Sequence, residues 1–182
     1  MLHVWQRNSV VLLVGVALAL GTRLACAQGV YRQAEIDSAG RLRIVLSNNR
    51  VIWPPRDSQQ VGFEKAAISA DHRVVGWLAL YPNCCTSYPV PLKLVLRHAD
   101  GRRTVISNEL PIWQWAFAAD GRSVVIRQAP VHGDAPTSYE LREIRTGRLV
   151  ATIQKDSTTN LPVWARVVRP RSDSSPPFSN KR

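Results

Sequence analysis

The residues best suited to chemistry in this chain are two adjacent cysteines, Cys84 and Cys85, in the proline-bearing stretch YPNCCTSYPVP. Consecutive Cα atoms lie about 3.8 Å apart across a trans peptide, whereas a disulfide usually joins Cα atoms about 4.4–6.8 Å apart. A bond between neighbours therefore closes a strained ring, which prolines on both sides favour by fixing φ. We predict a Cys84–Cys85 disulfide, with a bridge to a second chain and two reduced thiols as the open alternatives.

Other chemistries fit these residues less well. Dithiol oxidoreductases separate their cysteines by two residues at the start of a helix, and here the cysteines are adjacent. The sequence has no Gly-x-Ser-x-Gly elbow, and Asp134 near His132 is typical of a solvated loop. Histidines at His72, His98 and His132 lack the spacing of metal ligands. We therefore name no catalytic residue, no metal ligand and no cofactor.

Alternating apolar and polar residues predict strands, because successive strand side chains point to opposite faces. The clearest cases are Arg41–Leu46, Leu92–Arg97 and Tyr139–Arg142. Tight-turn signals, mostly Asp-Gly and its relatives, fall between the strands. These signals are Ser38–Arg41, Ala70–Arg73, Ala99–Arg102, Ala119–Arg122 and Arg145–Arg148.

An internal repeat organises these strands. Trp53, Trp113 and Trp164 end similar short segments and are separated by 60 and 51 residues. Each of the first two is followed by a hairpin of one kind and then by a second hairpin, so the unit is about four strands. Because these tryptophans recur at repeat positions, we predict that they pack in the core, as do Trp77 and Trp115.

The segments ISADHRVVGWLAL and FAADGRSVVIRQ resemble a hairpin of WD-type and Tol-Pal-type β-propeller blades, and YELREIRTGRLVATI resembles the outer hairpin of such a blade. The resemblance covers about Ala66–Ile153 and implies blade-like sheets, with almost no information on function. Ala70 and Ala119 replace the usual proline, and His72 replaces the usual glycine.

Propellers close with four or more blades, but this chain has only two full units and part of another at each end. We predict an all-β, antiparallel fold in which two propeller-blade-like four-stranded sheets pack together, as a sandwich or an open partial propeller. Completion of a ring by several chains is the alternative. Helix should be nearly absent after the leader.

Two long connections leave the repeat at equivalent places, Tyr81–Pro91 and Gln128–Ser138. Loops at equivalent corners lie at one end of a repeat fold, and loop residues carry function more often than framework residues. A Cys84–Cys85 ring would give a flat apolar plate between two tyrosines, although it could equally serve only to stiffen the loop. The candidate binding residues are Tyr81, Asn83, Cys84, Cys85, Tyr88 and His132.

The N-terminus predicts export. Arg7 precedes the apolar run Val10–Leu20, which is too short to favour a membrane span, and Ala25-Cys26-Ala27 fits a signal peptidase site. We predict a signal peptide at 1–27 with cleavage after Ala27, a β-repeat domain at 28–168 and a disordered basic tail at 169–182. An uncleaved anchor and lipidation of Cys26 are less favoured alternatives.

The whole chain carries a formal charge of +11, and removal of the leader would leave +9. A positive net charge of this size suits an anionic partner. It is also typical of a protein surface that is simply soluble. We predict a periplasmic or extracellular module, not integral to the membrane, that binds an unknown protein or small ligand through the Tyr81–Pro91 loop. The alternative is a protein that binds an anionic envelope component or another polyanion, without sequence-specific nucleic-acid recognition. An uncharacterised enzyme comes third.

Overall fold

The computed structural model describes residues 30–133, 136–155 and 160–169. The predicted signal peptide, and all of the predicted tail except Arg169, lie outside these ranges. Within them, no helix has both the length and the apolar character needed to cross a membrane.

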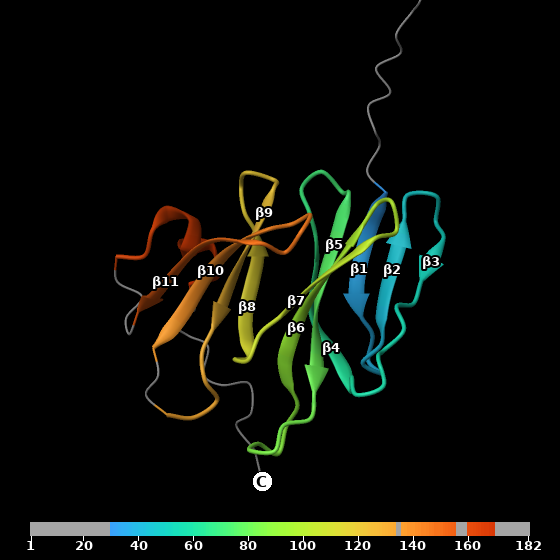
Figure 1. The fold of residues 1–182 in the computed structure, drawn as a ribbon. Coiled ribbons are helices and arrows are strands. Elements are labelled where there is room, and N and C mark those ends of the chain that lie inside the picture. Colours follow the sequence, from blue (N-terminus) through green and yellow to red (C-terminus); the bar gives the residue numbers. More distant parts are fainter. Residues whose placement is uncertain (1–29, 134–135, 156–159, 170–182) are drawn as a thin grey trace, which may run out of the picture.

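Eleven strands of the described chain form three antiparallel sheets, each a meander in chain order (Figure 1). The N-terminal sheet comprises β1 (Tyr31–Ile36), β2 (Leu42–Leu46) and β3 (Val51–Ile52). The central sheet comprises β4 (Gly62–Ile68), β5 (Val74–Tyr81), β6 (Val90–His98) and β7 (Arg103–Ser107). The C-terminal sheet comprises β8 (Ile112–Phe117), β9 (Ser123–Gln128), β10 (Thr137–Glu143) and β11 (Leu149–Lys155), followed by the 3₁₀ helix η1 (Val163–Val168).

The all-β prediction and the two four-stranded sheets are confirmed. The N-terminal part-unit adds a third sheet of its own. The C-terminal part-unit differs from the prediction, because its tryptophan, Trp164, lies in η1 rather than at a strand. Ala165 and Val168 of η1 are three residues apart and lie on one side of this helix, and together with Leu161, which precedes it, they are buried against the C-terminal sheet.

The predicted turn chemistry is confirmed at the hairpins. Glycines at 40, 101, 121 and 147 all have positive φ, which costs a residue without Cβ little. His72 takes the same left-handed conformation, with φ of 58°. Its carbonyl accepts hydrogen bonds from the backbone N–H groups of Val30 and Tyr31, and its Nδ1 lies 2.8 Å from the Tyr31 carbonyl. The turn therefore fixes the start of the N-terminal sheet on the central sheet.

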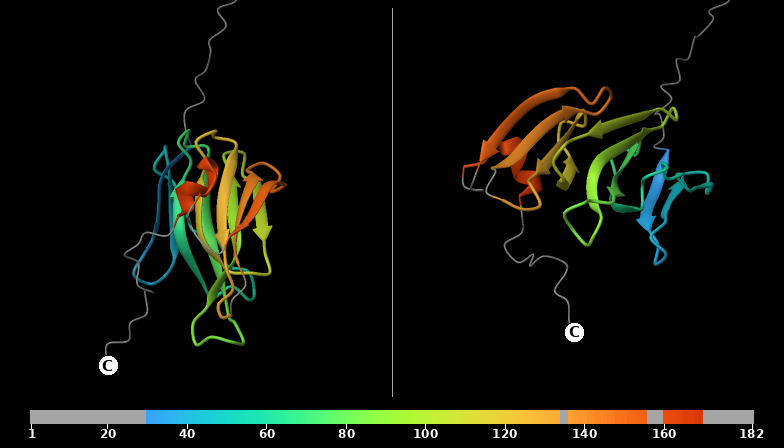
Figure 2. Two further views of the ribbon diagram at one scale, coloured as in Figure 1. Left: turned by 90° about the vertical axis from the view of Figure 1, so that its left-hand side faces the viewer. Right: turned by 60° about the horizontal axis from the view of Figure 1, so that its bottom comes forward.

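The three sheets stack in chain order, as the right-hand view of Figure 2 shows. One apolar cluster, including Leu42, Ile44 and Trp77, fills the space between the N-terminal and central sheets. A second, including Leu94 and Ile126, joins the central and C-terminal sheets. The central sheet is therefore covered on both faces, which explains why β5 is an almost continuous run of buried apolar residues rather than an alternating one.

The described ends of this stack are closed. On the outer face of the N-terminal sheet, Glu35 accepts hydrogen bonds from Gln33 and Arg43, the latter at 2.8 Å. At the other end, η1 packs on the outer face of the C-terminal sheet. Because one outer face is polar and the other is covered, neither offers the apolar surface that a further sheet would need.

The central and C-terminal sheets approach closely where Trp115 of β8 lies on Gly76 of β5. A Cβ atom at position 76 would lie 2.5 Å from the Trp115 ring and 2.8 Å from Leu96. The indole N–H of Trp115 donates to the backbone carbonyl of Lys65 at 2.9 Å. Lys65 sits in a bulge of β4 with φ of 50°, and its ammonium group donates to the Trp113 carbonyl. The glycine thus leaves space for the Trp115 indole, and the β4 bulge supplies the carbonyl that accepts its N–H.

Gly76→Ala should destabilise the protein by about 1–3 kcal/mol, because the added methyl group overpacks a filled interface. Gly62→Ala is the matched control. Its Cβ would meet only the end of the Leu80 side chain at 3.2 Å, which can rotate away. Urea unfolding followed by fluorescence measures both variants. Equal stability of the two variants would contradict this account of the sheet interface.

Candidate functional site

The two long loops lie at the same end of the molecule, at the lower edge of Figure 1, as predicted. They also touch, because Nε2 of His132 lies 3.3 Å from the backbone carbonyl oxygen of Cys85. The structure thus brings His132 to the cysteine loop. Asp134, the acid near His132 in sequence, lies outside the described residues.

Cys84 and Cys85 are both exposed, and neither is bonded. Their Sγ atoms are 2.8 Å apart, longer than the roughly 2.05 Å of a disulfide, so the predicted bond stays a prediction. The side-chain oxygen of Asn83 accepts a hydrogen bond from the Cys85 backbone N–H at 3.4 Å. The hydrogen bond with Cys84 raises the pKa of Cys85, which is opposite to the lowered pKa that a reactive cysteine needs.

Tyr81, one of the candidate binding residues, is buried and is therefore not part of the exposed surface of the cysteine loop. Its ring is 6% exposed and belongs to the core between the N-terminal and central sheets. Its hydroxyl donates to Oδ2 of Asp57 at 2.5 Å, and the Lys93 ammonium lies 4.6 Å from the ring centroid and 3.2 Å from the same carboxylate. Tyr81 ends β5, where alternation points its side chain inward.

Tyr88 is half-buried, and its backbone carbonyl accepts a hydrogen bond from the Thr86 hydroxyl at 2.5 Å. The surface proposed from the sequence therefore retains Asn83, the two cysteines, Tyr88 and His132, but it loses one of its two aromatic side chains.

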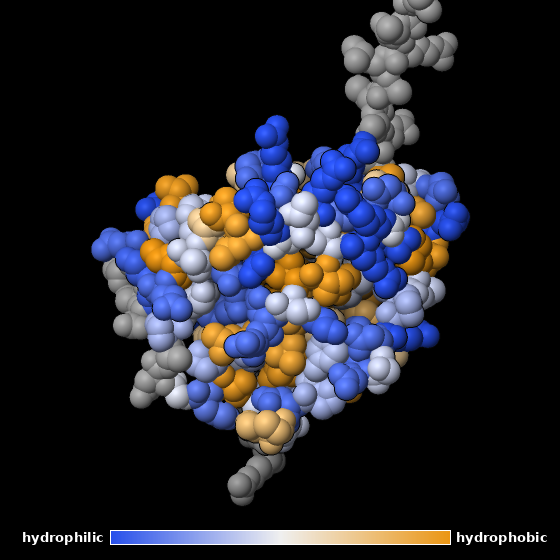
Figure 3. All heavy atoms as spheres, viewed as in Figure 1, coloured by the Kyte–Doolittle hydropathy of each residue, from blue (hydrophilic) through white to orange (hydrophobic). Residues whose placement is uncertain are grey.

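The opposite end of the molecule carries a concentration of arginine that sequence analysis did not identify. Five hairpin turns meet there, at the upper edge of Figure 1, and hydrophilic side chains gather over this edge in Figure 3. We call these turns the turn end, and they comprise residues 47–50, 69–73, 98–102, 118–122 and 144–148. The turn end holds three aspartates and six arginines, namely Arg50, Arg73, Arg102, Arg122, Arg145 and Arg148.

The aspartates of the turn end bond their own turns. Each accepts a hydrogen bond from the backbone N–H two residues later, for example Asp120 from Arg122 at 2.8 Å. The backbone hydrogen bond from Arg102 lowers the pKa of Asp100. These carboxylates thus accept hydrogen bonds from the backbone of their own turns. Within the described chain, no ion pair is formed by Arg50, Arg73, Arg122 or Arg145.

A hollow of about 420 Å³ opens between the turns of the central and C-terminal sheets, and its charged lining comprises Arg102, Arg122 and Arg145 together with the acids Asp100 and Glu143. His98 also lines it, and burial lowers the pKa of this histidine. Nε2 of His98 lies 2.9 Å from the Thr104 hydroxyl, which donates to the Arg145 carbonyl at 3.0 Å. This chain of bonds fixes the turn of one sheet to the turn of the next.

The tryptophans divide into two groups. Trp77 and Trp115 are buried, as predicted, and Trp113 donates its indole N–H to the Ala129 carbonyl. Trp53 is 48% exposed, so its prediction as a core residue is wrong. Two prolines follow Trp53, and because proline cannot continue the hydrogen-bonded ladder, β3 ends before the ring reaches the sheet interface. The two prolines after Trp53 were therefore the sequence feature that could have predicted its exposure.

No protein-family model matches the sequence, and no curated protein matches it.

The vicinal disulfide can be tested on protein made in an oxidising compartment. We expect a monomer that takes up no alkylating label until it is reduced and then takes up two, as measured by intact mass. Reduction should cost little stability, because almost no loop is closed. The double variant Cys84→Ser/Cys85→Ser should take up no label before or after reduction. A dimer on a non-reducing gel, or immediate labelling of both cysteines, would contradict the prediction.

The Tyr81–Asp57 contact predicts a pH-dependent stability. The Tyr81 hydrogen bond lowers the pKa of Asp57 from 3.8 to about 2. Because this folded-state pKa is below the unfolded value, the stabilisation is present above pH 4 and is lost as pH falls through about 2. Tyr81→Phe should raise the pKa of Asp57 and destabilise the protein at pH 5 but not near pH 2.

Urea unfolding across this pH range and an NMR titration of the Asp57 carboxyl group measure the two effects. Tyr139→Phe is the control, since it removes a hydroxyl group from another buried ring and should change stability equally at each pH. An Asp57 that titrates near 3.8 in the unaltered protein would overturn the prediction.

Proposed function

We propose that the protein is exported and binds an anionic envelope component through its turn end. The observation that supports this most directly is the gathering of six arginines against three aspartates on five adjacent turns. A guanidinium group presents N–H donors in a plane that matches phosphate and carboxylate oxygens. The predicted leader would deliver the module to the envelope, and the predicted basic tail would add to the attraction.

Rigid turns suit these arginines to phosphate-bearing headgroups. Each arginine at positions 73, 102 and 122 follows an aspartate that is held by the turn backbone. Their Cα positions are therefore fixed, and only side-chain entropy is lost on binding. The hollow between Arg102, Arg122 and Arg145 offers room for one headgroup to contact several guanidinium groups together.

The cysteine loop is the second candidate surface, with a protein or small ligand as its partner. The contact of His132 with Cys85 favours it, because that contact holds two exposed loops together. Such binding would survive added salt and be lost in Tyr88→Ala, whereas turn-end binding would weaken steeply with salt. We also propose that the central and C-terminal sheets are two blades of an open propeller, on the strength of their shared meander order.

Binding to vesicles that contain phosphatidylcholine and one-third phosphatidylglycerol tests the turn end. We expect binding at low salt, none to pure phosphatidylcholine vesicles, and loss at high salt. Each basic side chain near such a surface contributes roughly 1 kcal/mol. The triple variant Arg102→Gln/Arg122→Gln/Arg145→Gln should therefore bind about 100-fold more weakly.

A second triple variant, Lys93→Gln/Arg127→Gln/Lys155→Gln, removes the same charge from strand segments next to the two long loops, at the opposite end of the molecule. It should bind nearly as well as the unaltered protein. Equal weakening of both triple variants would show that net charge alone acts, and it would refute a specific turn-end surface. Absence of vesicle binding at low salt would also refute the proposal.

A further inference from the structure

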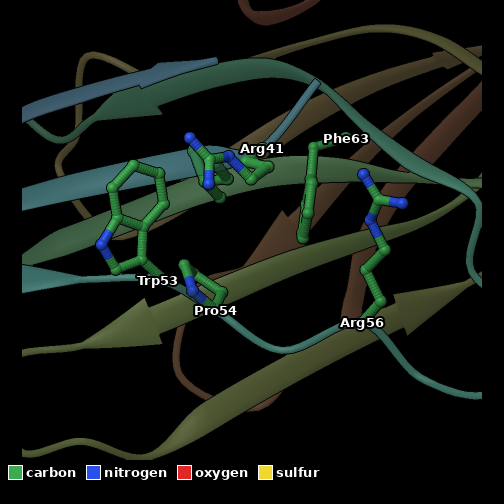
Figure 4. A pocket seen from close by; sticks show the side chains of 6 residues that line it. Arg41, Trp53, Pro54, Arg56 and Phe63 are labelled. Atoms are coloured by element: carbon green, nitrogen blue, oxygen red, sulfur yellow. The ribbon is translucent and has the colours of Figure 1, made fainter. Parts of the chain in front are cut away.

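An open recess of about 250 Å³ lies beside the N-terminal sheet, away from both the turn end and the cysteine loop. Residues from the start of β2, from the segment after β3 and from β4 form it, as Figure 4 shows. The residues that line it are Arg41, Leu42, Trp53, Pro54, Arg56 and Phe63.

Aromatic rings and guanidinium groups alternate across this recess. The Arg41 guanidinium carbon lies 4.9 Å from the Trp53 ring centroid. The Arg56 guanidinium carbon lies 5.5 Å from the Phe63 ring centroid. In Figure 4 these side chains follow one another in the order Trp53, Arg41, Phe63, Arg56. Stacking uses the faces of a guanidinium group and leaves the N–H groups at its edge available for hydrogen bonds.

Both arginines are held in place by one further bond. Nε of Arg41 donates to Asp37 at 2.9 Å, and Nη2 of Arg56 donates to the Gly40 carbonyl at 3.0 Å. Asp37 also accepts the backbone N–H groups of Ala39 and Arg41. The remaining guanidinium N–H groups have no bond among the described residues, and the lining contains two cations and no acid. Asp37 occupies only Nε of Arg41, so the Nη groups of this fixed guanidinium remain as donors suited to an oxyanion.

We propose that this recess binds a carboxylate carried on a single ring, with the carboxylate on the free N–H groups of Arg41 and the ring against the neighbouring Trp53, while Arg56, on the other side of Phe63, adds positive charge. The half-exposed indole offers the flat apolar surface that a ring requires. The volume is below the roughly 300–1,000 Å³ of pockets that enclose drug-sized ligands, which favours one ring over a longer segment. A sugar acid and an aromatic acid share this chemistry. The inference does not depend on the turn end, which contributes no residue to the recess.

Two-dimensional ¹H–¹⁵N NMR detects binding through the indole N–H signal of Trp53, which Trp53→Phe identifies. The probes are galacturonic acid, its neutral methyl ester, benzoate and acetate. We expect a saturable shift with galacturonic acid or benzoate, and at least about tenfold weaker binding of the methyl ester and of acetate. The acid that binds more tightly shows whether the natural ligand is a sugar acid or an aromatic acid.

Variants test the roles of the side chains. Arg41→Gln should weaken binding by about tenfold, as expected for loss of a charge-assisted hydrogen bond, whereas Arg56→Gln, across the Phe63 ring, should weaken it less. Arg169→Gln, which removes one charge near η1, should bind normally, and the amide spectrum of each variant reports whether the fold is intact. Absence of a shift with both acids, equal binding of the methyl ester, or equal binding of acetate would overturn the proposal.

Discussion

The packing of the Trp115 ring directly on Gly76 sets the distance between the central and C-terminal sheets. A side chain at position 76 would occupy the space of the indole, and the indole N–H is satisfied only because the β4 bulge turns the Lys65 carbonyl toward it. The hollow at the turn end lies between these same two sheets. The spacing of Arg102 from Arg122 and Arg145 therefore depends on how closely the sheets approach, so the packing of the core positions the charged surface.

The stack ends because both of its outer faces are made unsuitable for further packing. Alternation along β1 and β2 places Gln33, Glu35 and Arg43 outward, and their hydrogen bonds are satisfied among themselves. At the other end Leu161 and the η1 residues Ala165 and Val168 cover the C-terminal sheet. The three sheets thus bury two apolar interfaces and the face under η1.

A short turn sequence serves both the fold and the charged surface. In Asp-Gly-Arg at positions 100–102 and 120–122, the aspartate bonds the turn, the glycine supplies positive φ, and the arginine follows at the rim. Because meander strands alternate in direction, every second connection reaches the same end. The same alternation sends the longer loops with Cys85 and His132 to the opposite end, where they meet. Two different surfaces thus arise from one repeat.

Strand positions, turns and the four-strand unit could be predicted from the sequence, because alternation and turn residues are local properties. The meeting of the two loops followed from the repeat. The exposure of Trp53 and the burial of Tyr81 could not be predicted, because the same residue type packs inward or outward according to where its strand ends relative to the neighbouring sheet. The arginine turn end joins residues far apart in the chain, and the alternation of Trp53, Arg41, Phe63 and Arg56 joins residues of two different sheets. Only the stacking of the sheets brings such residues together, because burial is decided by the surface that each sheet meets.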